Sequence, residues 1–171
     1  MQIGLHFKAG LLLAMLLVIC DQLSKYWILN GLNLDEVGRV NLLPFLSFTM
    51  VWNEGISMSL PIGDFLGRWG LVLLTGLISI WLLNWLRTTG RKFEATALAM
   101  IIGGAIGNII DRLVHGAVVD FIHLHAGGYN FYVFNVADSA ITVGAVLLLF
   151  DGLRDGAKGP KNASKTNEVD A

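Results

Sequence analysis

Two aspartates lie in stretches of the sequence that otherwise carry no charge. Asp120 stands in Val118-Val119-Asp120-Phe121, and Asp138 stands 18 positions later in Phe134-Asn135-Val136-Ala137-Asp138-Ser139. A carboxylate at membrane depth is costly and is retained where it has a function. Two carboxyls that meet around one water supply an acid and a base, which is the chemistry of an aspartic hydrolase.

The composition indicates that these carboxyls belong to a membrane protein. Hydrophobic residues occupy 54% of the 171 positions and charged residues only 15%, whereas soluble domains carry about 25% charged residues. The formal net charge of −1 gives no indication of a nucleic-acid partner, and a lone cysteine, Cys20, excludes an intramolecular disulfide framework. Cleavage before Cys20, as in a lipoprotein signal, is disfavoured because Ile19 stands where a small residue is needed.

Four segments are long enough to cross a bilayer core, which takes about 20 apolar residues. They cover residues 7–29, 65–86, 94–114 and 135–153. Four spans put both termini on one side. Of the 12 cationic residues, 8 flank the spans on that side: Lys8, Arg87, Arg91, Lys92, Arg154, Lys158, Lys161 and Lys165. The positive-inside rule therefore predicts cytoplasmic N- and C-termini.

The segment between the first two spans has the periodicity of a strand. Apolar residues alternate with others from Leu46 to Trp52, and the alternation resumes from Ile56 to Leu60 after Asn53-Glu54-Gly55. This pattern predicts a hairpin, with a plain connecting loop as the alternative. The expected fold is an all-α membrane protein with four transmembrane helices and a small outer-surface β-hairpin or sheet between helices 1 and 2.

The chain is expected to form one integral membrane domain. Residues 1–155 make up this domain, and the polar residues 156–171 are expected to form a disordered cytoplasmic tail.

The acidic residues of the spans converge on one level of the bilayer. At about 1.5 Å of rise per residue, Asp21 lies roughly 20 Å from the cytoplasmic edge, Asp111 about 28 Å and Asp138 about 24 Å. Asp120 follows Asp111 by nine residues, past Gly116, and belongs to the same level. Spacing and depth alone leave Asp111 as a rival of Asp120 and Asp138 for an acid–base pair.

Several of these residues also have structural interpretations. Asp21 with Lys25 has the i,i+4 spacing of a self-neutralising pair, and Asp111 next to Arg112 suits a structural anchor. Asn135 is expected to cap the fourth helix, with Asp138 in its first turn, and this role is compatible with function.

The small residues of Gly103-Gly104-Ala105-Ile106-Gly107 predict that neighbouring helices approach the third span closely. The consequence would be geometric, because a close approach could bring the polar face of this span up to the fourth.

Other types of catalytic site and other functions have weaker support in the sequence. His123 and His125, with His115 nearby, form a weak metal pattern, and the sequence has no His-Glu-x-x-His motif. It also has no Gly-x-Ser-Gly of a serine intramembrane protease and no Gly-x-Gly-Asp. A proton-coupled transporter or membrane scaffold remains the second interpretation, although a polar layer near one face, away from the midplane, argues against it.

Four ordered segments resemble those of bacterial lipoprotein signal peptidase, also called signal peptidase II. They are Asp21-Gln22-Leu23-Ser24-Lys25, Asn108-Ile109-Ile110-Asp111-Arg112-Leu113, Val118-Val119-Asp120-Phe121 and Phe134-Asn135-Val136-Ala137-Asp138-Ser139-Ala140. The resemblance implies a multi-pass aspartic endopeptidase of the bacterial cytoplasmic (inner) membrane with its active site near the outer, periplasmic face. Such an enzyme removes signal peptides from prolipoproteins, cutting on the N-terminal side of the diacylglyceryl-modified cysteine.

The resemblance also implies roles for single residues. Asp120 and Asp138 match the catalytic pair, which decides against Asp111. The residues implied to bind substrate or to support the site are Asp21, Lys25, Asn53, Gly55, Asn108, Asp111, Arg112, Asn135 and Ala137. No metal or cofactor is implied, and the expected partners of a monomeric enzyme are diacylglyceryl-modified prolipoproteins and membrane lipids. Two adjacent carboxyls are expected to share one proton, because both cannot ionise cheaply.

Overall fold

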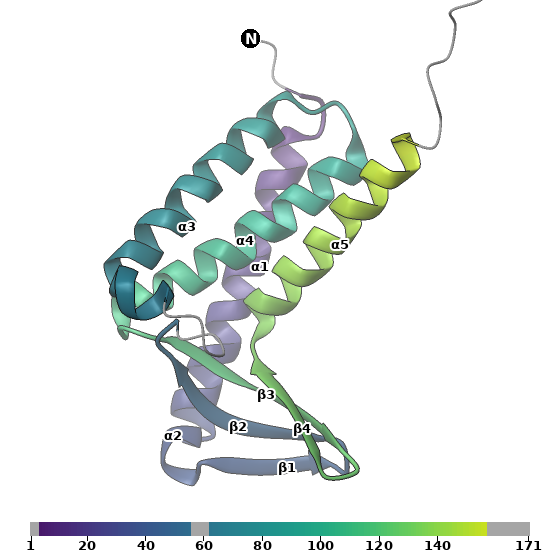
Figure 1. Ribbon diagram of the computed structural model, residues 1–171. Helices are drawn as coiled ribbons and strands as arrows, with labels where there is room; N and C mark the ends of the chain where they lie inside the picture. The colour runs from purple at the N-terminus through teal and green to yellow at the C-terminus, as the bar shows by residue number, and fades with distance from the viewer. Residues whose placement is uncertain (1–3, 56–61, 157–171) are drawn as a thin grey trace, which may run out of the picture.

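Four long apolar helices make up most of the protein. The computed structural model describes residues 4–55 and 62–156. Within these ranges, the helices with the length and composition to cross a membrane are α1 (Phe7–Tyr26), α3 (Ile62–Thr88), α4 (Lys92–Val114) and α5 (Val136–Gly156). The backbone of α3 is non-helical at Gly67, and its membrane-crossing part is Gly67–Thr88. These helices form a bundle (Figure 1). The prediction of four membrane helices is therefore confirmed, and the expected tail lies almost entirely outside the described residues.

The first helix continues beyond the bundle. After Tyr26 it becomes a π-helical turn, η1 (Trp27–Gly31), in which the Leu32 amide donates to the carbonyl of Trp27 at 3.0 Å. A short helix, α2 (Leu34–Val37), follows. This extension lies beside the sheet at the lower end of the molecule (Figure 1), so it supplies an apolar support outside the bundle.

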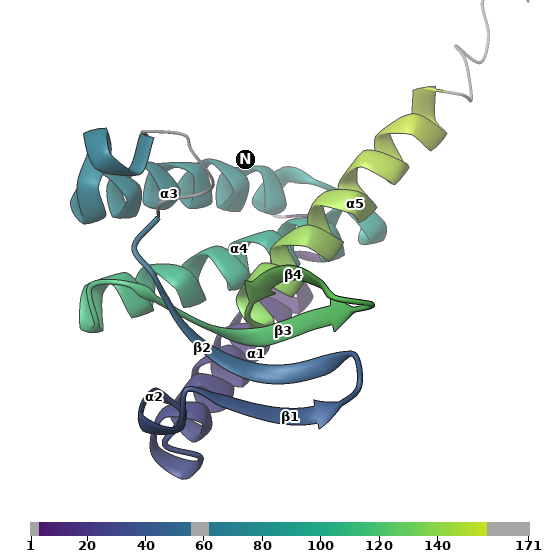
Figure 2. The ribbon, with the colours of Figure 1, turned by 60° about the horizontal axis from the view of Figure 1, so that its bottom comes forward.

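A four-stranded antiparallel sheet lies at one end of the helices (Figure 2). Its strands, in the order β1-β2-β3-β4, are Arg39–Leu43, Leu46–Asn53, Val118–Ala126 and Tyr129–Phe134. Buried Val119 and Phe121 of β3 pack with Ile28 of η1 and Leu34 of α2. The sheet therefore buries one apolar face against η1 and α2, beyond the end of α1.

The strand pairing in the sheet differs from that of the expected hairpin. The strand expected from Leu46 to Asn53 is present as β2, but β2 pairs with β1 and β3. The expected second arm, beyond Gly55, lies outside the described residues. Two strands come from after α4, so the sheet is not confined to the segment between the first two membrane helices. A two-stranded hairpin is marginal alone, and the additional strands complete the buried face.

Helix α4 is the centre of the bundle and packs against α1, α3 and α5. Glycines allow the close approach. A Cβ added at Gly103 would lie 2.8 Å from the carbonyl oxygen of Ala14, and one at Gly107 would lie 2.6 Å from the Asp21 carboxylate. Both distances are shorter than real contacts allow, so the small-residue stretch brings the polar faces of neighbouring helices together, as its sequence predicts.

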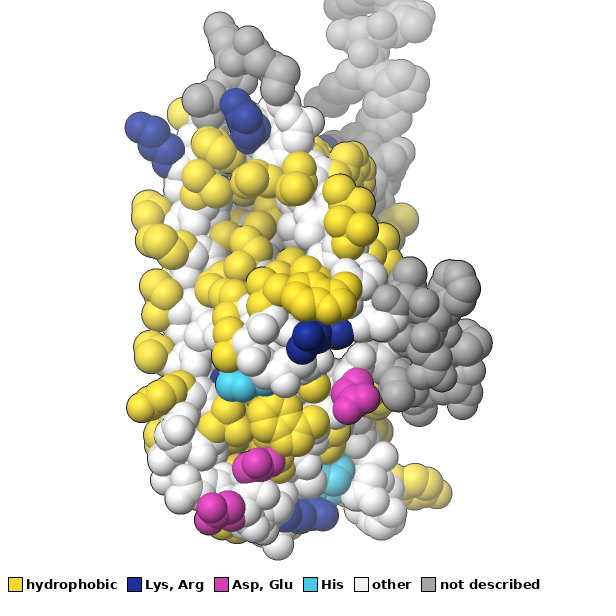
Figure 3. Space-filling model, turned by 90° about the vertical axis from the view of Figure 1, so that its left-hand side faces the viewer, with side chains coloured by type: hydrophobic (Ala, Val, Ile, Leu, Met, Phe, Trp, Pro, Cys, Tyr) yellow, Lys and Arg dark blue, Asp and Glu magenta, His cyan; other side chains and the backbone are white. Residues whose placement is uncertain are grey.

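The outward faces of the helices are apolar. Leu73, Trp81, Val146 and Phe150 are among the large hydrophobic residues that remain exposed. Hydrophobic side chains also cover much of the helical part of the face in Figure 3, whereas acidic side chains lie in its lower part. Such a surface suits contact with lipid along the helices and with water at the sheet end.

Candidate active site

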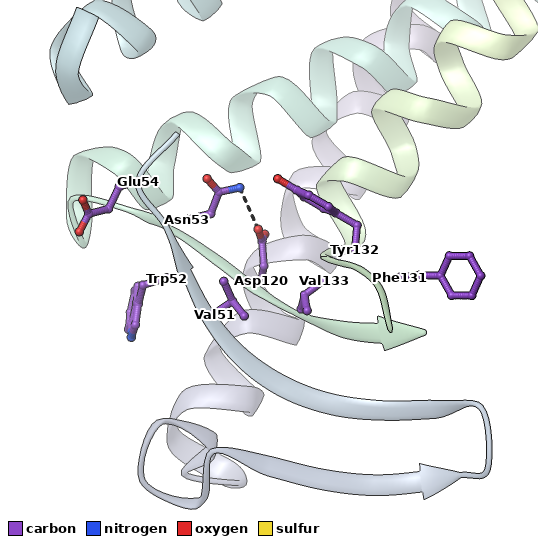
Figure 4. A pocket seen from close by; sticks show the side chains of 8 residues that line it. All are labelled: Val51, Trp52, Asn53, Glu54, Asp120, Phe131, Tyr132 and Val133. Carbon is purple, nitrogen blue, oxygen red and sulfur yellow. Dashed lines mark hydrogen bonds between the residues drawn. The ribbon is translucent and has the colours of Figure 1, made fainter. Parts of the chain in front are cut away.

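The carboxyl group of Asp120 is held between two amide donors. Asp120 lies on β3 opposite Val51 of β2, and Asn53 follows two positions along β2 on the same face. Nδ2 of Asn53 donates to Oδ2 of Asp120 at 2.9 Å (Figure 4), and Nδ2 of Asn135 donates to Oδ1 at 2.7 Å. Strand register and the start of α5 together position this buried acid.

Asp138 forms a reciprocal cap with Asn135. The backbone amide of Asp138 donates to Oδ1 of Asn135 at 2.8 Å, and the backbone amide of Asn135 donates to Oδ2 of Asp138 at 3.3 Å. This is the arrangement of a capping box, which satisfies amides at a helix N-terminus. Asn135 therefore has the expected capping geometry and also contacts Asp120, so one side chain joins the two aspartates.

Asn108 of α4 provides a second connection. Its Nδ2 donates to Oδ1 of Asp138 at 2.7 Å, and its Oδ1 accepts from Nδ2 of Asn135 at 3.3 Å. One turn later, Nη1 of Arg112 donates to the carbonyl of Asn108 at 3.4 Å. The guanidinium interacts electrostatically with both Asp138 and Asp120. Its Nε is buried and has no hydrogen-bond partner within the described part of the chain, so this donor remains open to a ligand.

Gly55 orients Asn53. The backbone amide of Gly55 donates to Oδ1 of Asn53 at 2.8 Å, which turns the NH₂ group of Asn53 toward Asp120. Gly55 has φ of 96°, in the left-handed region where a residue without Cβ is favoured. The turn after β2 therefore fixes which end of the Asn53 amide faces the acid.

Burial raises the pKa of Asp120 from its ordinary 3.8 to about 6. The hydrogen bond from Asn53 acts in the opposite direction by stabilising the carboxylate, the negative charge of Asp138 raises the pKa further, and the hydrogen bond from Asn135 again lowers it. Asp120 therefore retains a proton at a higher pH than an exposed aspartate.

A buried ion cluster is connected to the two acids through Asn108. Nζ of Lys25 is 2.7 Å from Oδ2 of Asp21 and 2.7 Å from Oδ2 of Asp111, and it donates to Oδ1 of Asn108 at 3.3 Å. All three charged side chains are almost completely buried. The expected i,i+4 pair of Asp21 and Lys25 is present within α1. Lys25 also contacts Asp111 of α4, so Asp111 belongs to this cluster.

Each carboxylate of the cluster also holds a backbone amide near the site. Asp21 accepts from the amide of Ala137 at 2.9 Å, and Asp111 accepts from the amide of Val119 at 3.0 Å. Ala137 therefore takes part through its backbone. These contacts place all of the residues implied to be catalytic or supporting within one connected network.

A cavity of about 390 Å³ opens beside Asp120. Its lining residues are Val51, Trp52, Asn53, Glu54, Asp120, Phe131, Tyr132 and Val133. The Tyr132 hydroxyl points toward the Asn53 side of the cavity, whereas Phe131 points away from it (Figure 4). The volume lies in the range of small-molecule and peptide side-chain sites. Asp138 is not part of this lining and is connected to it through Asn135.

Sequence reasoning missed two residues of the site. Tyr132 was not singled out because the strand β4 was not expected, although its apolar and aromatic run was a usable signal. Gln22 was overlooked between Asp21 and Lys25, yet its Nε2 donates to Oδ1 of Asp111 at 2.9 Å. The available signal was that Gln22 is a polar amide at the same membrane depth as the buried acids.

The histidines have other neighbours. His123 contacts Thr49 through Nδ1 at 3.0 Å, and its ring centroid lies 5.5 Å from that of His125. His115 packs against Trp52 with ring centroids 5.7 Å apart. Within residues 4–55 and 62–156 no group of three or more potential ligands among His, Cys, Asp and Glu has the geometry to hold a metal ion.

Comparison with known proteins identifies the family. Residues 13–154 match the family model described as signal peptidase (SPase) II. The chain is 44% identical over 155 residues to a lipoprotein signal peptidase of Methylorubrum extorquens, covering 90% of this chain and 91% of that protein. It is 46% identical over 154 residues to a lipoprotein signal peptidase of Methylobacterium radiotolerans, covering 89% of this chain and 90% of that protein.

A solved structure agrees with these matches. It is described as a bacterial membrane enzyme at 2.3 Å resolution, and it superposes with a TM-score of 0.78 at 30% identity, covering 96% of this chain and 99% of that chain. Membership in a peptidase family decides against the transporter or scaffold interpretation. The chain belongs to the signal peptidase II family, and its four apolar helices make it a multi-pass membrane protein.

Proposed function

We propose that this protein is an aspartic endopeptidase that removes signal peptides from prolipoproteins. Asp120 and Asp138 are the catalytic residues, and the cut falls on the N-terminal side of a cysteine that carries diacylglyceryl. The proposal is supported most directly by Asn135. Its side chain donates to Asp120 at 2.7 Å, and it exchanges the two hydrogen bonds of a capping box with Asp138. One residue thus contacts both carboxyls, that of Asp120 through its side-chain amide and that of Asp138 through its backbone amide.

The reaction requires one proton on the pair. The ionised carboxyl takes a proton from water as the water oxygen attacks the scissile carbonyl carbon, and the protonated carboxyl donates its proton to the carbonyl oxygen. The resulting tetrahedral intermediate collapses when its C–N bond breaks and the amine leaves with a proton from the carboxyl that had acted as base. A hydroxyl proton of the intermediate returns to the other carboxyl, so the pair regains its starting charge.

Asp120 is the favoured carrier of the shared proton. Burial raises its pKa to about 6. Asp138 accepts hydrogen bonds from Asn108 and from the backbone of Asn135, and Arg112 adds a nearby positive charge. With the shared proton on Asp120, Asp138 is the carboxyl left to act as base in the proposed reaction. The open Nε of Arg112 is available to a carbonyl oxygen of the substrate.

The site is proposed to face the periplasm. The N-terminal end of α1, the connection from α3 to α4 and the C-terminal end of α5 lie together at the end opposite the sheet (Figure 1). These are the regions of Lys8, Arg87, Arg91, Lys92 and Arg154, and the positive-inside rule assigns such regions to the cytoplasm. The sheet and the carboxyl pair would then meet a substrate at the outer membrane surface, where the lipid-modified cysteine is located.

The test is a gel-shift cleavage assay on a diacylglyceryl-modified prolipoprotein. The wild type is compared with Asp120→Asn and Asp138→Asn, and Glu36→Gln serves as a control because Glu36 is an exposed acid on α2. Both aspartate variants are expected to lose cleavage while they still bind substrate, and the control is expected to cleave normally. Retained cleavage in either aspartate variant would contradict the proposal.

The substrate provides a second comparison. The same prolipoprotein without the diacylglyceryl group, but with its cysteine intact, is expected to remain uncut by the wild type. Equal cleavage of both forms would leave the peptidase assignment in place and remove the proposed requirement for the lipid.

A further inference from the structure

The two carboxylates of the ion cluster each contact the backbone next to one of the two catalytic residues. Asp111 accepts from the amide of Val119, the residue before Asp120. Asp21 accepts from the amide of Ala137, the residue before Asp138. Each buried carboxylate of the cluster therefore holds the backbone N–H of the residue directly before one catalytic aspartate.

Lys25 joins the two halves of this arrangement. Its ammonium group lies 2.7 Å from each of Asp21 and Asp111, and these contacts connect α1 to α4. A displacement of either carboxylate would move an amide that it holds, and through that amide the adjacent catalytic residue. The spacing between Asp120 and Asp138 is thus linked to contacts that neither of them makes.

Gln22 completes the contacts of both carboxylates. Its Nε2 donates to Oδ1 of Asp111 at 2.9 Å, lies 3.3 Å from Oδ2 of Asp21 and contacts the carbonyl of Gly107 at 3.2 Å. Oδ1 of Asp111 faces Gln22, whereas Oδ2 faces Lys25 and the Val119 amide. Gln22 is the donor that holds Oδ1, so together with the two contacts of Oδ2 it fixes the plane of the Asp111 carboxylate.

We infer that Gln22 is a positioning residue, which together with Asp21, Lys25 and Asp111 forms a clamp that sets the placement of Asp120 relative to Asp138. The inference rests on the proposed function of those two aspartates. Gln22 touches neither of them through any hydrogen bond in the described residues, so it acts through the held amides. Small displacements of reacting groups are costly, since about 1 Å can reduce a rate on the order of 100-fold.

Steady-state kinetics on the full chain in detergent micelles tests the effect on the reaction. In Gln22→Leu, kcat is expected to fall on the order of 10-fold or more, while KM stays within about twofold because substrate contacts are retained. Gln22→Glu has the same shape but brings a carboxylate against Asp21 and Asp111, so it is expected to lose more activity than Gln22→Leu. A role in packing alone predicts the opposite order, because Glu preserves the volume and branching of Gln.

Asn30→Leu is the matched control. Asn30 lies in η1, the continuation of α1, is exposed, and donates only to the carbonyl of Tyr26 among the contacts of the described residues. Its kcat is expected to equal that of the wild type. An unchanged kcat in Gln22→Leu, or a raised KM with unchanged kcat, would overturn the inference.

Amide hydrogen exchange provides a measurement that does not depend on cleavage. Exchange at the amides of Val119 and Ala137 is expected to accelerate in Gln22→Leu and to stay at the wild-type rate in Asn30→Leu. Unaltered exchange at both amides would overturn the clamp. Cleavage that persists in Asp120→Asn or Asp138→Asn would instead contradict the proposed function, and the exchange rates would still decide whether Gln22 holds these amides in place.

Discussion

Asn135 donates its side-chain N–H to the carboxylate of Asp120 at 2.7 Å. The orientation of this amide is fixed because its Oδ1 accepts from the backbone amide at the start of α5. One side chain thus begins a helix and holds an acid on a neighbouring strand. The helix start and the carboxyl pair are therefore parts of the same structural unit.

Substitutions of Asn135 should separate these two roles. Asn135→Ser retains an oxygen that caps the helix, whereas Asn135→Ala loses it, and this difference is expected to lower the stability of the Ala variant by about 1 kcal/mol relative to Ser. Both variants lose the donor to Asp120, so both are expected to lose roughly 100-fold in kcat. Thermal unfolding and cleavage kinetics measure the two effects, and a Ser variant with normal kcat would contradict the bridging role.

The pH dependence of cleavage should report the environment of Asp120. If the active form carries one proton on the pair, activity falls as pH rises and this proton is lost. Asn53→Leu removes a donor that lowers the pKa of Asp120, so that pKa rises above about 6. The alkaline limb of the kcat/KM profile is then expected to move to higher pH, while Glu36→Gln keeps the wild-type profile. A limb that moves to lower pH, or does not move, would contradict this account.

Removal of the buried ammonium group should destabilise the protein strongly. Lys25→Met leaves Asp21 and Asp111 facing each other without a cation, which is expected to cost about 3–5 kcal/mol because buried charges lose their partner. Lys25→Met combined with Asp111→Asn is expected to recover part of that stability, since it removes one of the two opposing charges. Thermal unfolding in detergent measures both, and a double variant less stable than the single one would argue against charge repulsion.

The close contact of α4 with α1 can be tested with a pair of glycines. A Cβ at Gly103 would meet the backbone of Ala14, whereas one at Gly76 in α3 would meet nothing within 4 Å. Gly103→Ala is expected to lower stability by roughly 1–3 kcal/mol through overpacking. Gly76→Ala is expected to be neutral or to stabilise by about 0.5–1 kcal/mol, because Ala is the better helix former. Equal unfolding temperatures for the two variants would contradict the tight contact.

The orientation in the membrane should be visible by cysteine labelling in a Cys20→Ser background. Glu36→Cys places a thiol beside the sheet, and Gly90→Cys places one in the connection between α3 and α4. In intact spheroplasts an impermeant thiol reagent is expected to label the first and not the second, whereas a permeant reagent labels both. The reverse pattern would place the carboxyl pair on the cytoplasmic side.

Much of the fold follows from local properties of the chain. The four apolar runs predicted the membrane helices because about 20 apolar residues match the hydrophobic thickness of a bilayer. The Gly103–Gly107 stretch predicted close packing because small side chains permit it. The sheet was predicted in part, since β2 alternates clearly, whereas the buried start of β3 reads Val118-Val119-Asp120-Phe121 without alternation.

The candidate site, like the fold, could be predicted only in part from the sequence. The sequence by itself determined which residues were available: charged and amide side chains stand out in apolar spans because burying them without a role is costly. Apart from the local pairs Asp21–Lys25 and Asn135–Asp138, only the tertiary structure decided their partners. Asp111 and Asp120 are nine residues apart, yet one joins the ion cluster with Lys25 and the other faces the cavity. That division depends on helix crossings and strand register, and these arise from contacts between segments that local sequence does not encode.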